Sequence, residues 1–374
     1  MLVALTDQNE TLVLQTSIPK DKLRQLRNER KFYCPQCKNN VQLKIGAIKI
    51  PHFAHKTNSA CEAFFSEGES EQHLLGKEHL YQLFLQLGYE VELESYIPNL
   101  KQRPDLLVKT KEGKHFAIEF QCSNISKEYL QARNSGYQLE NIQSIWIPNT
   151  PQRLNLSTGM MIVSLSEQFQ QFVLSTKNQR YILSYNPHKK QFIYFTNLLH
   201  IKDNQYLCKV QKMPLEQQIF PFYLPKKLTR NEFLYYFKTY LDSKVRFLNN
   251  RVLISRKGVN DLFLRSVYEL RLSFSTIPSF IGVPLKGNES LKVFAVEWQA
   301  SLFYFAHFYR VEISNFDRQV IKFFLKWAKL DVSEDSILMV SDYINLLKQL
   351  NIQHIYSSVE NDKLLESLYT QFLA

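Results

Sequence analysis

Two carboxylates stand out because of where the sequence places them. Asp105 follows a proline in RPDLLVKT (103–110), and Glu119 lies in HFAIEFQC (115–122). Both segments are typical of β-strands, and the intervening KEGK predicts a turn, so the two carboxylates are expected to lie side by side. Paired carboxylates repel each other unless a cation lies between them. Oxygen ligands of this kind suit Mg²⁺ or Mn²⁺, the ions used in phosphoryl chemistry.

Alternation along 115–122 places Gln121 on the same strand face as Glu119, opposite the apolar side chains. Because the carboxylates repel each other without a metal, Asp105→Asn is expected to retain or even raise stability. An Asp at the start of a strand and a Glu on an exposed strand face also occur in proteins without catalytic function. The spacing alone therefore leaves that alternative open.

A second group of residues has the spacing of a metal site. Cys34 and Cys37 form a Cys-x-x-Cys pair, and His52, His55 and Cys61 follow within the next segment. A structural Zn²⁺ ion takes four ligands, so one of these five candidates is surplus. We prefer Cys34, Cys37, His55 and Cys61, with His52 as a packing residue; a Cys₂His₂ set with both histidines is the alternative. Reduced thiols without metal also remain possible.

The elements that position the two carboxylates are indicated by changes of periodicity. Apolar residues at helical spacing and a terminal glycine predict a helix over 68–88, and three alternating segments predict strands over 89–97, 103–110 and 115–122. A helix over 126–141 and a buried strand over 144–148 follow. The predicted order is α-β-β-β-α-β.

These patterns divide the chain into three expected parts. Residues 1–62 form a small zinc-ribbon-like module, 63–166 the α-β-β-β-α-β domain, and 167–374 a basic, mostly helical domain that begins with a hairpin of 180–186 and 191–199. The fold class is therefore α+β with several domains. Helical patterns over 230–250 and 317–330 support the last assignment.

The net charge of +11 is unevenly distributed. Residues 1–150 hold 18 Lys and Arg against 17 Asp and Glu, so nearly all of the excess lies in 151–374. A basic region of this kind favours a polyanionic partner, most simply DNA, although a basic soluble domain has the same composition. No segment has the pattern of a signal peptide or of a membrane span, so we expect a cytoplasmic protein without membrane insertion.

Several motifs together carry a family resemblance. The segments CPQC, HFAH, ESEQHLLGK (69–77), RPD and EFQCS resemble those of the CoiA-like competence proteins, within the PD-(D/E)xK nuclease superfamily. The resemblance implies a restriction-endonuclease-like core and a metal-dependent DNA nuclease in natural genetic transformation. Asp105 and Glu119 would bind the divalent metal. Glu69, His73 and Lys77 share one helix face at i, i+4 and i+8, where Glu69 would complete the metal shell and His73 or Lys77 would contact phosphate.

One position departs from the superfamily pattern. Gln121 occupies the place where a lysine is usual, and an amide carries no charge and cannot act as a base. Lys77 is a candidate to supply the missing charge. The alternative function is a non-catalytic DNA-binding accessory of recombination that retains the nuclease fold. In either case the expected partners are single-stranded or branched DNA and recombination proteins.

Overall fold

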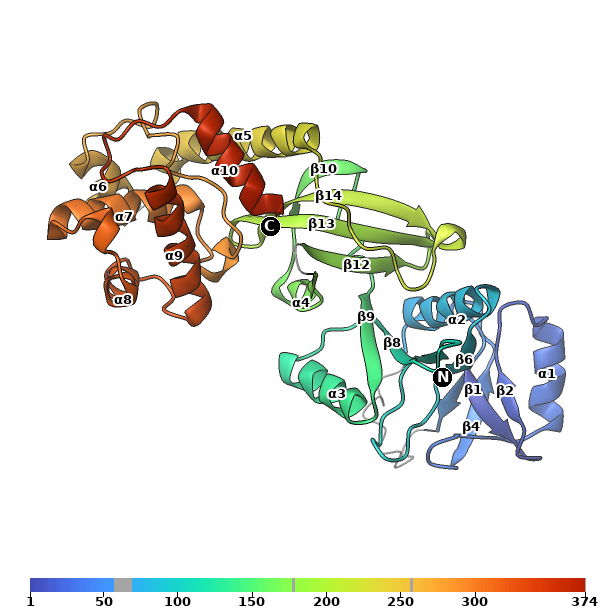
Figure 1. The fold of residues 1–374 in the computed structure, drawn as a ribbon. Helices are drawn as coiled ribbons and strands as arrows, with labels where there is room; N and C mark the ends of the chain where they lie inside the picture. Colours follow the sequence, from blue (N-terminus) through green and yellow to red (C-terminus); the bar gives the residue numbers. More distant parts are fainter. Residues whose placement is uncertain (57–68, 177–178, 256–257, 374) are drawn as a thin grey trace.

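The computed structural model describes residues 1–56, 69–176, 179–255 and 258–373. The molecule is elongated, with two lobes (Figure 1). One lobe holds the N-terminal sheet and the core around α2 and α3, and the other holds a second large sheet and the C-terminal helices. This is a mixed α+β architecture with several sheets and a helical C-terminal region, as expected from the sequence.

The N-terminal part is a small antiparallel sheet with one helix, α1 (Lys20–Glu29). The strand order is β2-β1-β3-β4-β5. The strands are β1 (Val3–Thr6), β2 (Thr11–Val13), β3 (Phe32–Tyr33), β4 (Asn40–Lys44) and β5 (His52–His55). Because β4 pairs with β5 in the register Val41↔His55, the histidine at the end of β5 lies close to the turn between β3 and β4.

The next part has its elements in the predicted order of helix, three strands, helix and strand. They are α2 (Glu71–Gln86), β6 (Glu90–Leu93), β7 (Leu106–Lys109), β8 (His115–Gln121), α3 (Lys127–Leu139) and β9 (Ile142–Pro148). The strand order is β6-β7-β8-β9, in which only the β8–β9 pair is parallel. Each helix begins at a serine, Ser70 or Ser126, whose side chain accepts a hydrogen bond from a first-turn amide.

Both faces of this four-stranded sheet are covered. Helix α2 packs on the face that carries Ile118 and Phe120, and Tyr137 of α3 packs with Ala117 on the other. Burial on both faces explains why β8 is buried at every position from Phe116 to Phe120. Any polar group of β8 that points toward a helix is therefore enclosed by protein.

The second large sheet is antiparallel, with the order β10-β14-β13-β12-β11. Its strands are β10 (Gly159–Ser164), β11 (Leu174–Ser175), β12 (Arg180–Asn186), β13 (Gln191–Lys202) and β14 (Gln205–Pro214), with the short helix α4 (Glu167–Gln170) between β10 and β11. The predicted hairpin is β12–β13. Because β10 pairs with β14, the predicted boundary between 166 and 167 falls within this sheet.

The C-terminal region is helical. Its α-helices are α5 (Arg230–Ile254), α6 (Leu262–Glu269), α7 (Ala295–Tyr309), α8 (Arg318–Trp327), α9 (Glu334–Gln349) and α10 (Asn361–Leu373). Helix α7 is largely buried as far as Ala306 and belongs to the largest hydrophobic cluster, which also includes Leu199 and Leu207 of the second sheet. None of the helices in the described ranges is long and apolar enough to span a membrane.

Candidate functional site

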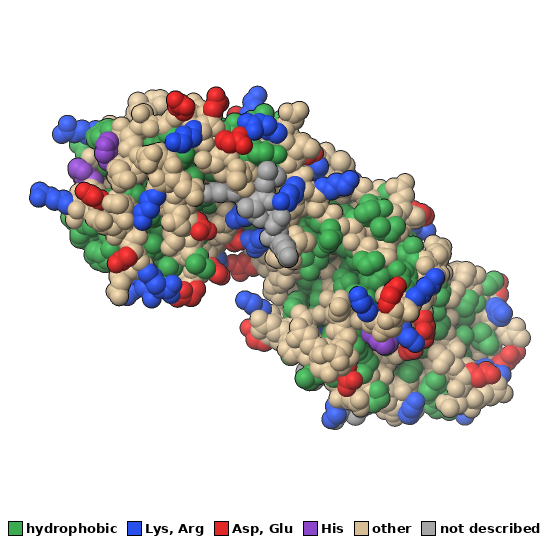
Figure 2. Space-filling view, in the orientation of Figure 1, with side chains coloured by type: hydrophobic (Ala, Val, Ile, Leu, Met, Phe, Trp, Pro, Cys, Tyr) green, Lys and Arg blue, Asp and Glu red, His purple; other side chains and the backbone are tan. Residues whose placement is uncertain are grey.

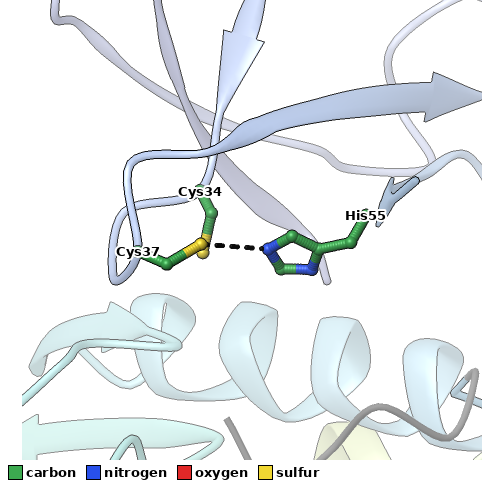
Figure 3. A group of neighbouring side chains, drawn as sticks. All are labelled: Cys34, Cys37 and His55. Atoms are coloured by element: carbon green, nitrogen blue, oxygen red, sulfur yellow. Dashed lines mark hydrogen bonds between the residues drawn. The ribbon is translucent and has the colours of Figure 1, made fainter. Parts of the chain in front are cut away.

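The Cys-x-x-Cys pair and one histidine come together at the N-terminal sheet. The ligand atoms of Cys34, Cys37 and His55 all lie within 4.8 Å of one another, and Cys37 Sγ is 3.3 Å from His55 Nε2 (Figure 3). A tight turn aims the two sulfurs the same way, because the Lys38 amide donates to the Cys34 carbonyl and Lys38 has a φ of 58°. The pairing of β4 with β5 then places His55 beside the two sulfurs.

This group fits a metal ion by its donor chemistry. Two thiols and an imidazole supply three ligands of a tetrahedral zinc site. Burial, followed by the charge of Arg103, lowers the pKa of His55, so its imidazole is neutral, as a metal ligand must be. The predicted fourth ligand, Cys61, lies outside the described residues. His52 is not in the group, because its Nδ1 donates to the Ile50 carbonyl at 2.9 Å.

Asp105 lies immediately before β7, where it meets β8 and α2. Its Oδ2 accepts a hydrogen bond from the Phe120 amide at 2.9 Å and lies 3.2 Å from His73 Nε2. His73 Nδ1 in turn lies 3.6 Å from Glu69. His73 and Lys77 of α2 therefore point at Asp105, whereas Glu69, predicted to lie on the same helix face, precedes the helix, which begins at Glu71 after the Ser70 cap.

Lys77 is the centre of this group. Its side chain is fully buried, and Nζ donates to Glu69 Oε1 at 2.5 Å, donates to Glu94, and lies 3.9 Å from Asp105 Oδ1. Glu69 also accepts from the Met1 amine at 2.6 Å. The cation that holds these carboxylates together is thus a lysine from α2.

The charges in this group shift one another's ionisation. Burial alone would raise the pKa of Asp105, but His73 and Lys77 hold it below its usual range. Burial likewise opposes ionisation of Glu69, and Lys77, the Met1 amine and His73 together place its pKa well below the usual range. The pKa of Lys77 is raised by Glu69, Glu94 and Asp105 against the effect of burial. Glu69, Asp105 and Lys77 are therefore all charged at neutral pH.

Glu119 has partners of its own, which come from α3. It is buried, and its Oε1 accepts hydrogen bonds from Arg133 and from the Tyr137 hydroxyl, both on α3. Arg133 also donates to the Arg103 carbonyl at 3.1 Å. Burial raises the pKa of Glu119, and Arg133 opposes that rise. Helix α3 covers this face of the sheet and encloses Glu119.

Gln121 lies at the end of β8 and is engaged locally. Its Nε2 donates to the Ser123 carbonyl at 2.9 Å and to the Ser123 hydroxyl at 3.1 Å. The amide is therefore held by the loop that follows β8, apart from the network around Lys77.

The carboxylates of the predicted metal site are paired with cations of the protein itself. Each of the three predicted acidic residues is paired with a protein cation: Glu69 and Asp105 with Lys77, and Glu119 with Arg133. Within the described parts of the chain, Cys34, Cys37 and His55 are the only set of three ligating side chains close enough to share an ion. Mg²⁺ and Mn²⁺ prefer several oxygen ligands that are free to converge on them.

Three participants in this site were not among the residues predicted from the sequence. Arg133 and Tyr137 are spaced i, i+4 on α3, a spacing that places two polar groups on one helix face toward Glu119. Glu94 follows β6 with a φ of 53° and accepts hydrogen bonds from Lys77 and from the Leu2 amide at 3.0 Å. A positive φ at a buried glutamate is unusual, but the sequence carries no signal for it.

Comparison with known proteins assigns these elements to a nuclease-like domain and places the chain in a family. The family model "Competence protein CoiA, nuclease-like domain" matches residues 69–227, and "Competence protein CoiA, N-terminal domain" matches 15–64. The chain is 30% identical over 280 residues to Competence protein CoiA of Bacillus subtilis (strain 168), covering 74% of this chain and 72% of that protein. This chain therefore belongs to the CoiA competence protein family. No solved structure matches it.

Proposed function

We propose that this chain acts in natural genetic transformation, where it processes imported DNA or promotes its recombination through the nuclease-like domain. The single observation that carries the proposal is the convergence of Asp105 with Glu69, His73 and Lys77 inside that domain. The name of the Bacillus relative supports the role in competence.

Hydrolysis of a phosphodiester is the first form of this function. It needs positive charge where negative charge develops on the phosphate. Lys77 lies 3.9 Å from Asp105 and carries the positive charge that the Gln121 amide lacks. The resemblance to PD-(D/E)xK nucleases implies Mg²⁺ or Mn²⁺ at Asp105 and Glu119, which would polarise the phosphate when bound. Both carboxylates would first have to be released from Lys77 and Arg133.

The second form is a DNA-binding accessory of recombination without catalysis. Two observations favour it. Every predicted carboxylate ligand is neutralised by a cation of the protein itself, and the Gln121 amide is engaged by Ser123. A domain of this kind would retain the nuclease architecture for shape and stability while other surfaces contact DNA.

Cleavage assays on the intact chain distinguish the two forms. The purified protein is incubated with single-stranded, double-stranded and branched DNA in Mg²⁺, Mn²⁺ or EDTA, beside the Asp105→Asn and Glu119→Gln variants. Hydrolysis predicts cleavage that needs the ion and disappears in both variants. Normal transformation in cells that carry either folded variant would contradict catalysis and support the accessory role.

A further inference from the structure

A cavity of about 440 Å³ lies where the elements α2 to β9, which we call the nuclease-like core, meet the second sheet. We call it the junction cavity. It is lined by residue 72 of α2, by the segment 149–156 that follows β9, by the β12–β13 turn and by parts of β13 and β14. None of the described residues that line it is acidic, whereas Arg153, His188, Lys189 and Lys212 are among them. The cavity therefore gathers positive charge without acidic neighbours.

The amides in the junction cavity are suited to the same ligand chemistry as its cations. Several Asn and Gln side chains line it, and these groups donate hydrogen bonds to phosphate oxygens without reading base identity. Lys212 Nζ donates to the Leu156 carbonyl at 2.7 Å, which holds the 149–156 segment against β14. Arg153 and Lys189 are solvent-exposed at the cavity and so can reach a bound anion.

The junction cavity lies next to the elements that carry the candidate site. Gln72 precedes His73, the residue that contacts Asp105. The Asn149 side chain donates to Gln72 Oε1 at 2.8 Å, and the Asn149 backbone amide donates to the Gln121 carbonyl at 2.7 Å. A chain of two hydrogen bonds thus joins the wall of the cavity to the end of β8.

We propose that the junction cavity binds the phosphate backbone of a single DNA strand beside the candidate site. This inference rests on the proposed function and specifies which part of the DNA is held, and where. Base-independent donors and cations without acidic neighbours fit a phosphodiester chain, and positively charged grooves of this kind track the backbone of single-stranded DNA. On the face shown in Figure 2, Lys and Arg of the described residues are interspersed with Asp and Glu over both lobes, whereas the described lining of the junction cavity holds no acidic residue.

Charge reversal at the junction cavity tests the proposal. Binding of a fluorescein-labelled oligothymidylate is followed by anisotropy at several salt concentrations for the unaltered chain, Lys189→Glu and Arg153→Glu/Lys189→Glu. The matched control for Lys189→Glu is Lys238→Glu, which makes the same charge change at an exposed position of α5. We expect the double variant to bind roughly tenfold or more weakly, with a salt slope reduced by about 0.7 for each phosphate that the protein no longer neutralises, and the control to bind normally.

Each other outcome has a definite meaning. Equal weakening by Lys238→Glu, or normal binding by the double variant, would overturn the junction cavity as the strand site while leaving the proposed function in place. Failure of the unaltered chain to bind any DNA would overturn both. Displacement of the oligonucleotide by low-millimolar inorganic phosphate at constant ionic strength would assign the cavity to a free anion instead of a strand. Unchanged circular dichroism of the variants establishes that they are folded.

Discussion

At the scale of single residues, the site is governed by internal charge pairing. The sequence suggests that Asp105 and Glu119 repel each other, yet each has a cation of its own, Lys77 for Asp105 and Arg133 for Glu119. A buried carboxylate in such a pair depends on its partner, because an unpaired buried charge is costly. The structure therefore reverses the expectation for Asp105→Asn.

We predict that Asp105→Asn lowers the free energy of unfolding by about 2 kcal/mol at neutral pH, since it removes a charge that His73 and Lys77 stabilise. The pKa of Asp105 is depressed in the folded state, so its contribution is fully present above the ordinary value of 3.8 and is lost as the pH falls below it. Urea denaturation of both proteins at neutral and acidic pH should show the difference shrinking in acid. Asp7→Asn, which alters the more exposed pair with Arg30, is the control and should change stability little. A variant as stable as the unaltered chain at neutral pH would contradict this role of the charge.

The cysteine cluster leads to a prediction about which histidine binds metal. We expect about one zinc ion per purified chain, and we expect Cys34→Ser and His55→Ala to lose the ion and unfold at lower temperature. His52→Ala is the matched control and should keep the ion, because His52 contacts the Ile50 carbonyl instead of the sulfurs. Metal analysis with thermal denaturation measures both effects. Equal zinc loss in the two histidine variants, or a folded chain without zinc, would refute the assignment.

At the scale of elements, the position of α2 is set by one close approach. A Cβ atom on Gly76 would lie 2.1 Å from the Phe120 ring, so α2 can cross β8 at this distance only because residue 76 has no side chain. Gly76 lies between His73 and Lys77 on the same helix. The crossing therefore determines how closely those two side chains approach Asp105.

Gly76→Ala is accordingly predicted to destabilise the chain by about 1–3 kcal/mol, even though alanine favours helices, because the added methyl displaces α2 from the sheet. We also expect this variant to bind or cleave DNA more weakly, because displacement of α2 moves His73 and Lys77 relative to Asp105. Gly46→Ala is the control: nothing lies within 4 Å of its added Cβ, and its stability should change by less than about 0.5 kcal/mol. Urea denaturation of the unaltered chain, Gly76→Ala and Gly46→Ala measures these differences in the free energy of unfolding. A Gly76→Ala variant as stable as the unaltered chain would show that α2 does not cross β8 tightly.

The order of elements could be predicted from the sequence, but the partners inside the site could not. Each element from α2 to β9 has a local signal, such as the serine cap of α2 or the alternation of β8. Alternation assigns Glu119 to a face of the sheet without saying that α3 covers that face. The pairing of β10 with β14 was missed for a similar reason, because it joins strands far apart in the chain.

At the scale of the whole molecule, the parts share their interior. One hydrophobic cluster joins Leu2 of the N-terminal sheet, Phe84 of α2, Phe120 of β8 and Phe192 of β13. Tyr185 of β12 adds a hydrogen bond of 2.9 Å to His79 of α2. The N-terminal sheet, the nuclease-like core and one face of the second sheet therefore stabilise one another across the predicted boundaries.

The chain passes from one sheet to the next at two consecutive peptide groups, and this has a consequence for amide exchange. The Asn149 amide donates to the Gln121 carbonyl of β8, and the Thr150 amide donates to the Tyr185 carbonyl of β12. Each of these two neighbouring protons is released to solvent only when its own sheet contact opens. Hydrogen–deuterium exchange should show the two amide protons exchanging at the same rate if the core and the second sheet open together in one event. If the second sheet detaches while the core stays closed, Thr150 should exchange before Asn149.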